Sequence, residues 1–372
     1  MYLSHLTLEN YRSHAAVSFD LSAPGVTVLL GPNGSGKTNV LEAVSVLSLG
    51  RSALGAEEAD QVRWEEAFFR VRGRAAADNG EEYVLEVACQ MAPRRVKAYF
   101  VSDVRVPAGR FVGSLPTVVF LPQTPELFAG PPAHRRQFLD QLLSQVSPEH
   151  FAALAQYGKV LRQRNALLKK IAEGIAAPED LSVWDGTLAD LGSRITLRRL
   201  ELLETLQCTL PEELASLGER FPGIALRYVR KGAAREQEAA AEELLRAFAQ
   251  SRERDVLLQS TTTGPHREDW ILDASGRAFC AFASRGQQRA AVLALLFLEV
   301  SYLELQRGEK PVVLLDDVFS ELDDAHQEAL FACLAGNQVL VTATHLPGDV
   351  RDVRVIAMAG DAKCMPATSA VR

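Results

Sequence analysis

The feature that most limits how this chain can fold is the octapeptide Gly-Pro-Asn-Gly-Ser-Gly-Lys-Thr at residues 31–38. A short β-branched and apolar run, 26–30, precedes it and predicts a buried strand, and the apolar stretch 39–49 after it predicts a helix. Strand, glycine-rich loop and helix together point several free backbone N–H groups and the positive end of the helix dipole at one anion. Gly34 and Gly36 let the backbone approach phosphates without an intervening Cβ. The sequence therefore predicts a P-loop that binds a nucleoside triphosphate.

Within this loop we expect Lys37 to reach the β- and γ-phosphates and the Thr38 hydroxyl to ligate Mg²⁺, so ATP and Mg²⁺ are the expected cofactors. The alternative, a glycine-rich turn that matches by chance, does not account for the flanking strand and helix. The residues assigned to ATP binding are the loop, the residue after it and an arginine at the end of the neighbouring strand: Gly31, Pro32, Asn33, Gly34, Ser35, Gly36, Lys37, Thr38, Asn39 and Arg12.

Composition excludes several classes of protein. The chain has 372 residues, enough for two lobes, and its hydrophobic fraction of 47% is that of an ordinary soluble protein. No apolar run reaches the length of a membrane span, so no membrane partner is expected. The five cysteines are far apart, which predicts reduced thiols and a cytoplasmic location and argues against a structural zinc site. Because the net charge is −7, binding of nucleic acid would require a local basic patch.

The order of predicted elements gives an α/β fold. The first third of the chain is rich in predicted strands, helical spacing dominates from about residue 122 to about 257, and strands then return. We expect a P-loop mixed sheet with an antiparallel β portion beside it and an inserted, mainly helical second lobe. The expected boundaries are 1–122 for the N-terminal part of the ATPase lobe, 123–260 for the helical arm lobe and 261–372 for the C-terminal part of the ATPase lobe.

A second motif supports ATP chemistry. The apolar run Val312–Leu315 predicts a strand, and Asp316 and Asp317 follow it directly. A P-loop enzyme keeps its Mg²⁺ carboxylate at this position, so Asp316 is expected to bind the metal with Thr38. Asp317 is then placed to orient or deprotonate the attacking water. Two acids after a strand often mark only a loop, but together with the P-loop they predict a catalytic site.

Three motifs in this order resemble the ABC-type ATPase heads of the SMC class. They are Gly31–Thr38, Ser284-Arg285-Gly286-Gln287, and Val312–Asp317 followed by Ser320-Glu321-Leu322-Asp323. More narrowly, the chain resembles the RecF family of bacterial recombination-mediator ATPases. The segments that carry this narrower resemblance span most of the length: 8–13, 130–140, 161–166, 263–267 and 284–287.

The resemblance implies a homodimer that closes head to head around ATP. The residues implied to act across the dimer on the partner's nucleotide are those of the signature and the D-loop: Ser284, Arg285, Gly286, Gln287 and Asp323. A serine before a helix can also be a plain N-cap, which leaves both roles open for Ser284. The resemblance further places Gln123 near a Q-loop position and His345 near that of a γ-phosphate sensor, although either can be an ordinary surface residue. Asp317 stands where most ABC ATPases have Glu, and its shorter side chain predicts slow hydrolysis.

The function implied is ATP-dependent DNA binding in recombinational repair, at gaps or junctions between single- and double-stranded DNA. The resemblance also implies weak DNA-dependent ATPase activity, support of recombinase loading, replication restart and SOS induction, and partners such as the mediator protein RecR. Two alternatives remain, the ATPase subunit of an ABC transporter and another SMC-like head. The helical insertion between P-loop and signature weakens the transporter alternative, and a P-loop kinase would leave the signature without a purpose.

The DNA-binding surface is less well defined by the sequence. The candidates are Arg94, Arg95, Lys97, Arg135 and Arg136, with further basic clusters at 162–170 and 198–199. Taken singly, a cluster of this kind is more often a solvated helix face than a DNA-binding site. Because few aromatic residues accompany them, we expect backbone-directed, sequence-independent binding rather than base stacking.

Overall fold

The structure is a computed structural model that describes residues 1–22, 25–122, 124–346 and 353–359. The chain divides into two compact units, and the expected α/β class is confirmed. Unit 1 comprises residues 1–125, 213–219 and 285–372, and unit 2 comprises residues 126–212 and 220–284.

The first sheet of unit 1 is antiparallel. Its strands lie in the order β2-β1-β4-β5-β6-β7. Their bounds are β1 Tyr2–Tyr11, β2 His14–Asp20, β4 Phe68–Ala76, β5 Glu82–Gln90, β6 Val96–Val101 and β7 Val104–Val106. Apolar side chains recur along one face of β1, where Leu6 and Leu8 are fully buried. This face supplies one side of the core of unit 1.

The second sheet of unit 1 carries the P-loop and is parallel throughout its described strands. The strand order is β14-β3-β13-β12-β8. Their bounds are β3 Val26–Leu30, β8 Thr117–Phe120, β12 Val312–Leu315, β13 Val339–Ala343 and β14 Arg354–Ala357. Continuous apolar runs are typical of such strands because both faces of a parallel sheet are covered. The antiparallel portion expected beside the P-loop sheet is therefore a sheet of its own, and the described strands of the P-loop sheet are parallel to their neighbours.

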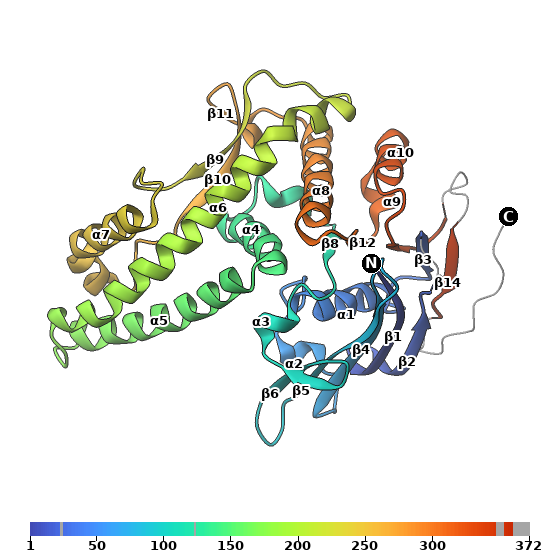
Figure 1. Ribbon diagram of the computed structural model, residues 1–372, viewed down its shortest axis with the longest axis horizontal. Helices are drawn as coiled ribbons and strands as arrows, with labels where there is room; N and C mark the ends of the chain where they lie inside the picture. The colour runs from blue at the N-terminus through green and yellow to red at the C-terminus, as the bar shows by residue number, and fades with distance from the viewer. Residues whose placement is uncertain (23–24, 123, 347–352, 360–372) are drawn as a thin grey trace. The chain divides into compact units, whose positions relative to one another are not determined.

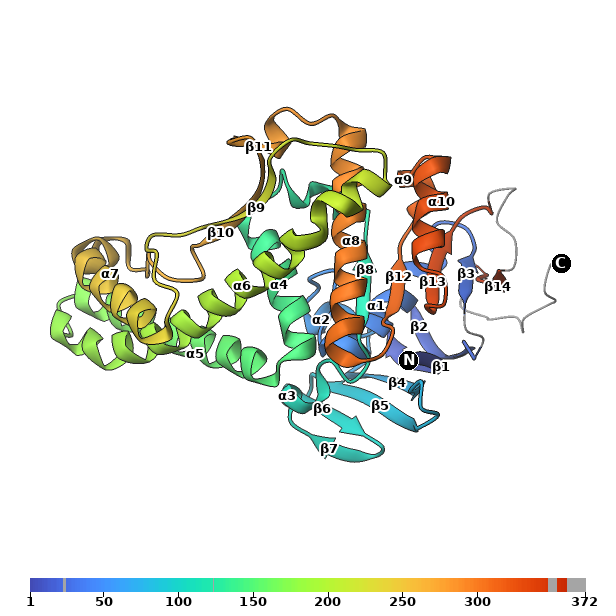
Figure 2. The same cartoon turned by 45° about the horizontal axis from the view of Figure 1, so that its top comes forward.

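Helix α1, Lys37–Leu49, lies between the two sheets of unit 1 (Figure 1). It contacts β1, β4 and β5 on one side and β8 and β13 on the other, and every residue from Val40 to Leu49 is buried. This explains why its sequence is apolar on most sides. Helix α8 packs against β8 and α10, and α9 packs against β13 (Figure 2). The bounds of the remaining helices are α2 Glu58–Gln61, α3 Ala108–Phe111, η1 Thr124–Leu127, α8 Arg285–Arg307, α9 Val318–Glu321 and α10 Asp324–Cys333.

Unit 2 is mainly helical, as Figure 1 shows for α5, α6 and α7. Its helices are α4 Pro132–Val146, α5 Pro148–Ala172, η2 Pro178–Leu181, α6 Ser182–Ser216, α7 Gln237–Leu258 and η3 Phe279–Ala281, and the end of α6 from residue 213 onward belongs to unit 1. A small sheet in the order β11-β10-β9 joins β9 Ile224–Val229, β10 Asp269–Ala274 and β11 Arg277–Ala278. Tyr157 of α5, Leu188 and Ile195 of α6 and Phe248 of α7 meet in its core. Within the described ranges no helix is long and apolar enough to cross a membrane.

One boundary lies elsewhere than the sequence suggested. The return of strand-like segments predicts that the ATPase lobe resumes at residue 261, whereas in the structure unit 1 resumes at Arg285. The physical reason is strand pairing: β10 pairs with β9 along its whole length, from Asp269 opposite Val229 to Ala274 opposite Ile224. Residues 261–284 are therefore held in unit 2.

Candidate nucleotide-binding site

The P-loop joins the end of β3 to the start of α1. Gly34 and Gly36 have positive φ angles of 81° and 87°, and Gly36 is the N-cap of α1. A Cβ on Gly36 would lie 2.7 Å from His14 Nε2 and 2.8 Å from Ser13 Oγ. The turn between β1 and β2 thus packs directly against the loop, and a side chain at position 36 has neither the space nor the backbone conformation it needs.

Polar groups of the loop are arranged for an anion. Lys37 Nζ donates to the carbonyl oxygens of Gly31, at 2.7 Å, and Pro32, at 2.8 Å, which holds the ammonium over the loop. Partial burial lowers the pKa of Lys37, and the charges of Asp316 and Asp317 act in the opposite direction. Ser35 Oγ is buried and has no hydrogen-bond partner among the described residues. Such an orphaned hydroxyl is what a bound phosphate oxygen would satisfy.

The two expected Mg²⁺ ligands meet across the parallel sheet. Thr38 Oγ1 donates to Asp316, at 3.0 Å from Oδ1 and 3.1 Å from Oδ2, and Asp316 is only 5% exposed. Two cis ligands of an octahedral Mg²⁺ at about 2.1 Å are roughly 3.0 Å apart, so the hydroxyl and carboxylate fit this metal. No cluster of three His, Cys, Asp or Glu side chains lies in the described part of the chain. A cation held here would therefore complete its shell with phosphate and water oxygens, as Mg²⁺ usually does.

Thr342 of β13 is a member of this site that sequence reasoning did not identify. Its hydroxyl donates to Asp316 Oδ1 at 2.6 Å and accepts the backbone N–H of Asp317 at 2.9 Å. Asp317 has a positive φ of 49°, and its Oδ1 accepts a hydrogen bond from Ser320 Oγ at 3.0 Å. Thr342 thus fixes both acids relative to Thr38. The available signal was a single hydroxyl in the otherwise apolar, fully buried strand 339–343.

Arg12 lies beside α1 but is engaged with protein groups. Its Nε and Nη2 donate to the two oxygens of Glu42, both at 2.7 Å, and its Nη1 donates to the carbonyl of Asp60 at 2.8 Å. The hydrogen bonds that Arg12 donates to the Glu42 carboxylate raise the pKa of Arg12. A nucleotide contact by Arg12 stays a prediction, and its visible role is to tie the end of β1 to the P-loop helix. Glu42 was the sequence signal for this ion pair, because a lone acid in an apolar, buried helix needs a charged or hydrogen-bonding partner.

The remaining residues of the P-loop lie at the surface of the protein or beside the β1–β2 turn. Pro32 and Asn33 are exposed, and Asn39 Nδ2 donates to Ser13 Oγ at 2.9 Å. This bond is a second link between α1 and the β1–β2 turn. The whole predicted loop, residues 31–39, therefore lies in one place, together with the side chains of Asp316 and Thr342.

The signature begins α8. Ser284 directly precedes the helix, Arg285 is its first residue, and Gly286 lies in its first turn. Gln287 Nε2 donates to Glu219 Oε2 at 3.3 Å. The position of Ser284 is that of an N-cap, which suits either of the two roles left open for it.

The other motif residues are placed separately. Asp323 is the N-cap of α10, and its carboxylate accepts a hydrogen bond from the backbone N–H of His326 at 2.9 Å. This bond, together with the contact to His326 Nδ1, lowers the pKa of the Asp323 carboxyl. His345 follows β13, is exposed, and contacts Thr344 Oγ1 at 3.0 Å. Gln123 lies outside the described residues. The roles of these residues stay predictions.

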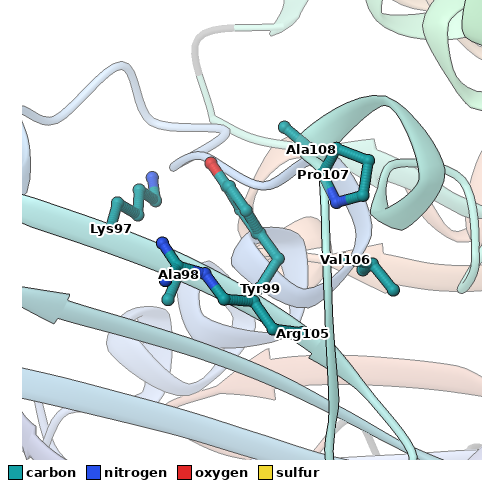
Figure 3. A pocket seen from close by; sticks show the side chains of 7 residues that line it. All are labelled: Lys97, Ala98, Tyr99, Arg105, Val106, Pro107 and Ala108. Atoms are coloured by element: carbon teal, nitrogen blue, oxygen red, sulfur yellow. The ribbon is translucent and has the colours of Figure 1, made fainter.

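The DNA-binding candidates fall into two groups. In unit 1, Arg95 and Lys97 both pair with Glu58, and Arg94 is exposed beside them. Lys97 Nζ lies 5.8 Å from the centroid of the Tyr99 ring, at a pocket of about 330 Å³. Figure 3 shows Lys97 and the exposed Arg105 on the same side of that ring.

In unit 2, by contrast, several candidates are buried. Arg135 donates to Asp269 through Nε and Nη2, both at 2.8 Å, and to three backbone carbonyls through Nη1. Arg136 Nη1 donates to the carbonyl of Glu268 at 2.8 Å. Two arginines of the further clusters, Arg164 and Arg199, are 0% and 3% exposed. Arg135, Arg164 and Arg199 therefore serve the packing of unit 2, which corrects their interpretation as surface residues.

Comparison with known proteins agrees with this architecture. The RecF/RecN/SMC N-terminal domain family matches residues 2–347. The DNA replication and repair protein RecF of Heliobacterium modesticaldum is 36% identical over 353 residues, covering 93% of this chain and 93% of that protein. That of Geobacillus thermodenitrificans is 35% identical over 363 residues, covering 95% of each. These relatives favour the DNA-repair alternative over the transporter alternative.

Solved structures of RecF are also similar to this chain. The recombination mediator protein RecF with ATP, from the RecFOR pathway, has a TM-score of 0.89 at 32% identity, covering 98% of this chain and 97% of that one. An SMC head bound to a winged-helix domain of ScpA, at 15% identity and a TM-score of 0.53, shares the fold alone. The resemblance drawn from the motifs is thereby confirmed. This chain belongs to the RecF/RecN/SMC N-terminal domain family and, within it, to the DNA replication and repair proteins named RecF.

Proposed function

We propose that this protein is an ATP-dependent DNA-binding protein of recombinational repair, which acts at gaps or at junctions between single- and double-stranded DNA. The observation that carries the ATP part is the cluster of Lys37, Thr38, Asp316 and Thr342 at the P-loop. Its RecF relatives carry the repair part, and the solved RecF structure with ATP supports ATP as the ligand.

In the proposed site each residue has a distinct task. The backbone N–H groups of the loop and the ammonium of Lys37 bind the phosphates, and the Ser35 hydroxyl supplies a further donor. Thr38 and Asp316 would hold Mg²⁺, and the ion would supply positive charge to offset the charge that develops on the phosphates during hydrolysis. Asp317 accepts a hydrogen bond from the attacking water and orients it. Its short side chain supports slow hydrolysis, and DNA dependence of the ATPase is part of the proposal.

ATP is proposed to close two copies of this chain head to head. The signature, Ser284 to Gln287, and Asp323 of the D-loop would face the nucleotide bound by the P-loop of the partner copy. A serine hydroxyl at the start of a helix, together with the positive end of the helix dipole, is the kind of anion site that a γ-phosphate needs, and Ser284 stands at the start of α8. Hydrolysis then removes a ligand shared by both copies, which releases the dimer.

DNA is proposed to contact the edge of the antiparallel sheet. Lys97 and Arg105 lie on the same side of the Tyr99 ring, and Arg94 and Arg95 precede β6 in the chain. Glu58 is the one acid paired with these four cations among the described residues. Contacts of this kind go to phosphates and are independent of base sequence. Recruitment of further mediators such as RecR, and support of recombinase loading, replication restart and SOS induction, complete the proposal. The four free cysteines of the described ranges fit the cytoplasmic location that we propose.

The test compares wild type with Lys37→Met, Ser284→Arg and the control Lys159→Met, a lysine that is exposed on α5 and lies outside the candidate DNA-binding clusters. We expect Lys37→Met to abolish ATP binding, and Ser284→Arg to keep ATP binding but lose ATP-dependent dimerisation in sedimentation. Both should lose the ATP-dependent part of binding to gapped DNA, and the control should keep it. If neither nucleotide nor these substitutions changes DNA binding, the proposed function is wrong.

A further inference from the structure

Unit 2 contains a cavity of about 280 Å³ that the ATP site does not explain. Its walls are the end of β9 and the loop after it, one face of α7, and the loop 262–268. The apolar residues that line the cavity are Val229, Ala240, Leu244 and Ala247. Every lining residue belongs to unit 2.

Basic groups at the rim are available for a ligand. Lys231 is exposed and has no hydrogen bond or ion pair with any residue that the structure describes. Arg267 donates through Nε to the Thr261 carbonyl at 3.3 Å and through Nη2 to Ser260 Oγ at 3.2 Å, which leaves Nη1 unused among the described residues. Two cations thus lie at the rim with unused donors.

The two acids in the wall are already satisfied. Glu243 Oε1 accepts the backbone N–H groups of Ala233 and Ala234, both at 3.1 Å. Glu268 Oε2 accepts the hydroxyls of Thr196 and Tyr228, both at 2.7 Å. Because these carboxylates are bonded to the protein, the unused polar groups of the cavity are mainly donors, and donors select an anion.

The loop that presents Arg267 is held rigidly from behind. The backbone N–H and hydroxyl of Thr262 donate to Asp255 Oδ1 at 2.9 and 2.6 Å. Gly264 has a φ of 122°, and a Cβ there would lie 2.5 Å from the hydroxyl of Tyr157. That hydroxyl is 2.7 Å from His266 Nδ1. A pre-organised loop loses little entropy on binding, which is the property of a recognition site.

We propose that this cavity binds a nucleoside phosphate independently of the P-loop. Lys231, Arg267 and the hydroxyl of Thr263 take the phosphate, and the sugar or base packs against Leu244 and Ala247. Its size is near the lower end of small-ligand sites, about 300 Å³, which limits the occupant to about one nucleotide. The occupant is either a free nucleotide or one nucleotide of a DNA strand. The inference goes beyond the ATP-gated function, because no P-loop residue takes part in it.

The test uses the full-length protein with the P-loop filled by ADP. The probes are dTMP, measured by equilibrium dialysis, and a fluorescein-labelled dodecamer of thymidylate, measured by anisotropy. The variants are Lys231→Glu, which reverses a rim charge, and Ala247→Trp, which fills the cavity without a charge change. The matched control is Arg246→Glu on the same helix, since Arg246 is 66% exposed and does not line the cavity.

We expect both variants to weaken binding at least about tenfold, the usual size for loss of a charge-assisted contact, and the control to change it less than twofold. Loss of dTMP binding identifies a free nucleotide as the occupant, and loss of dodecamer binding alone identifies DNA. Wild-type affinity in both variants, or equal losses in Lys231→Glu and Arg246→Glu, overturns the proposal. ATP affinity should be unchanged in every variant, so this outcome is separate from failure of the P-loop function.

Discussion

Arg164 of α5 is the most consequential buried charge in unit 2. It is 0% exposed, its Nε donates to Asp185 at 2.7 Å, and its Nη1 donates to Asp255 at 2.7 Å and to Thr261 Oγ1 at 2.9 Å. Its guanidinium carbon also lies 5.2 Å from the centroid of the Phe248 ring. One arginine thus neutralises part of the charge of two buried acids and joins α5, α6 and α7.

Replacing it with methionine, Arg164→Met, keeps most of the volume and removes the charge. Asp185 and Asp255 are then left buried without their common partner, and breaking a buried pair in this way costs about 3–5 kcal/mol. With a urea dependence of about 2 kcal/mol per molar, the unfolding midpoint of unit 2 falls by roughly 1.5–2.5 M. The exposed neighbour Arg162 provides the control Arg162→Met, which should change the free energy of unfolding by less than about 0.5 kcal/mol.

The assay is urea unfolding followed by tryptophan fluorescence. Trp184 and Trp270 lie in unit 2 and Trp270 is fully buried, whereas Trp64 of unit 1 is 91% exposed and changes little on unfolding. The fluorescence transition therefore reports unit 2. Equal midpoints for Arg164→Met and Arg162→Met would refute the reasoning, because they would mean that the buried acids do not need their cation.

Three further predictions concern single contacts. Gly36→Ala would place a Cβ 2.7 Å from His14 Nε2, on a residue whose φ is 87°. The loop must shift to relieve this contact, so ATP binding, measured by calorimetry, should weaken at least about tenfold. Thr342→Val removes the 2.6 Å hydrogen bond to Asp316, so steady-state ATP hydrolysis should fall about tenfold or more while Mg²⁺-free nucleotide binding is kept. Burial lowers the pKa of His266 to about 4, so the native state stays neutral while the unfolded state takes up a proton below about 6.5. The unfolding free energy of unit 2 should therefore fall from pH 6.5 to 4 by up to about 1.4 kcal/mol per pH unit, and a His266→Gln variant with the same pH slope as wild type would contradict this.

Buried charges mark where sequence reasoning failed. Arg164 and Arg199 were interpreted within basic surface clusters, yet Arg164 pairs with Asp255, which is 91 positions away along the chain. Arg199 likewise pairs with Asp140, 59 positions away, at 2.7 Å. A cluster of arginines has the same local pattern whether it faces solvent or acids brought in from a distant segment, so composition and spacing cannot distinguish the two.

The sequence alone determined what is local. A glycine-rich loop between an apolar strand and helix has few alternatives, because backbone N–H groups, glycine conformations and the helix dipole all act within about ten residues, and this was enough to predict the P-loop. Asp316 could be predicted to complete it, because parallel strands end at one edge of a sheet. Tertiary structure decided the rest: that Thr342 holds both acids, that Glu42 occupies Arg12, that β10 pairs with β9, and that the loop at Arg267 borders a cavity. Each of these depends on segments far apart in the chain meeting in space, and only the packed fold brings them together.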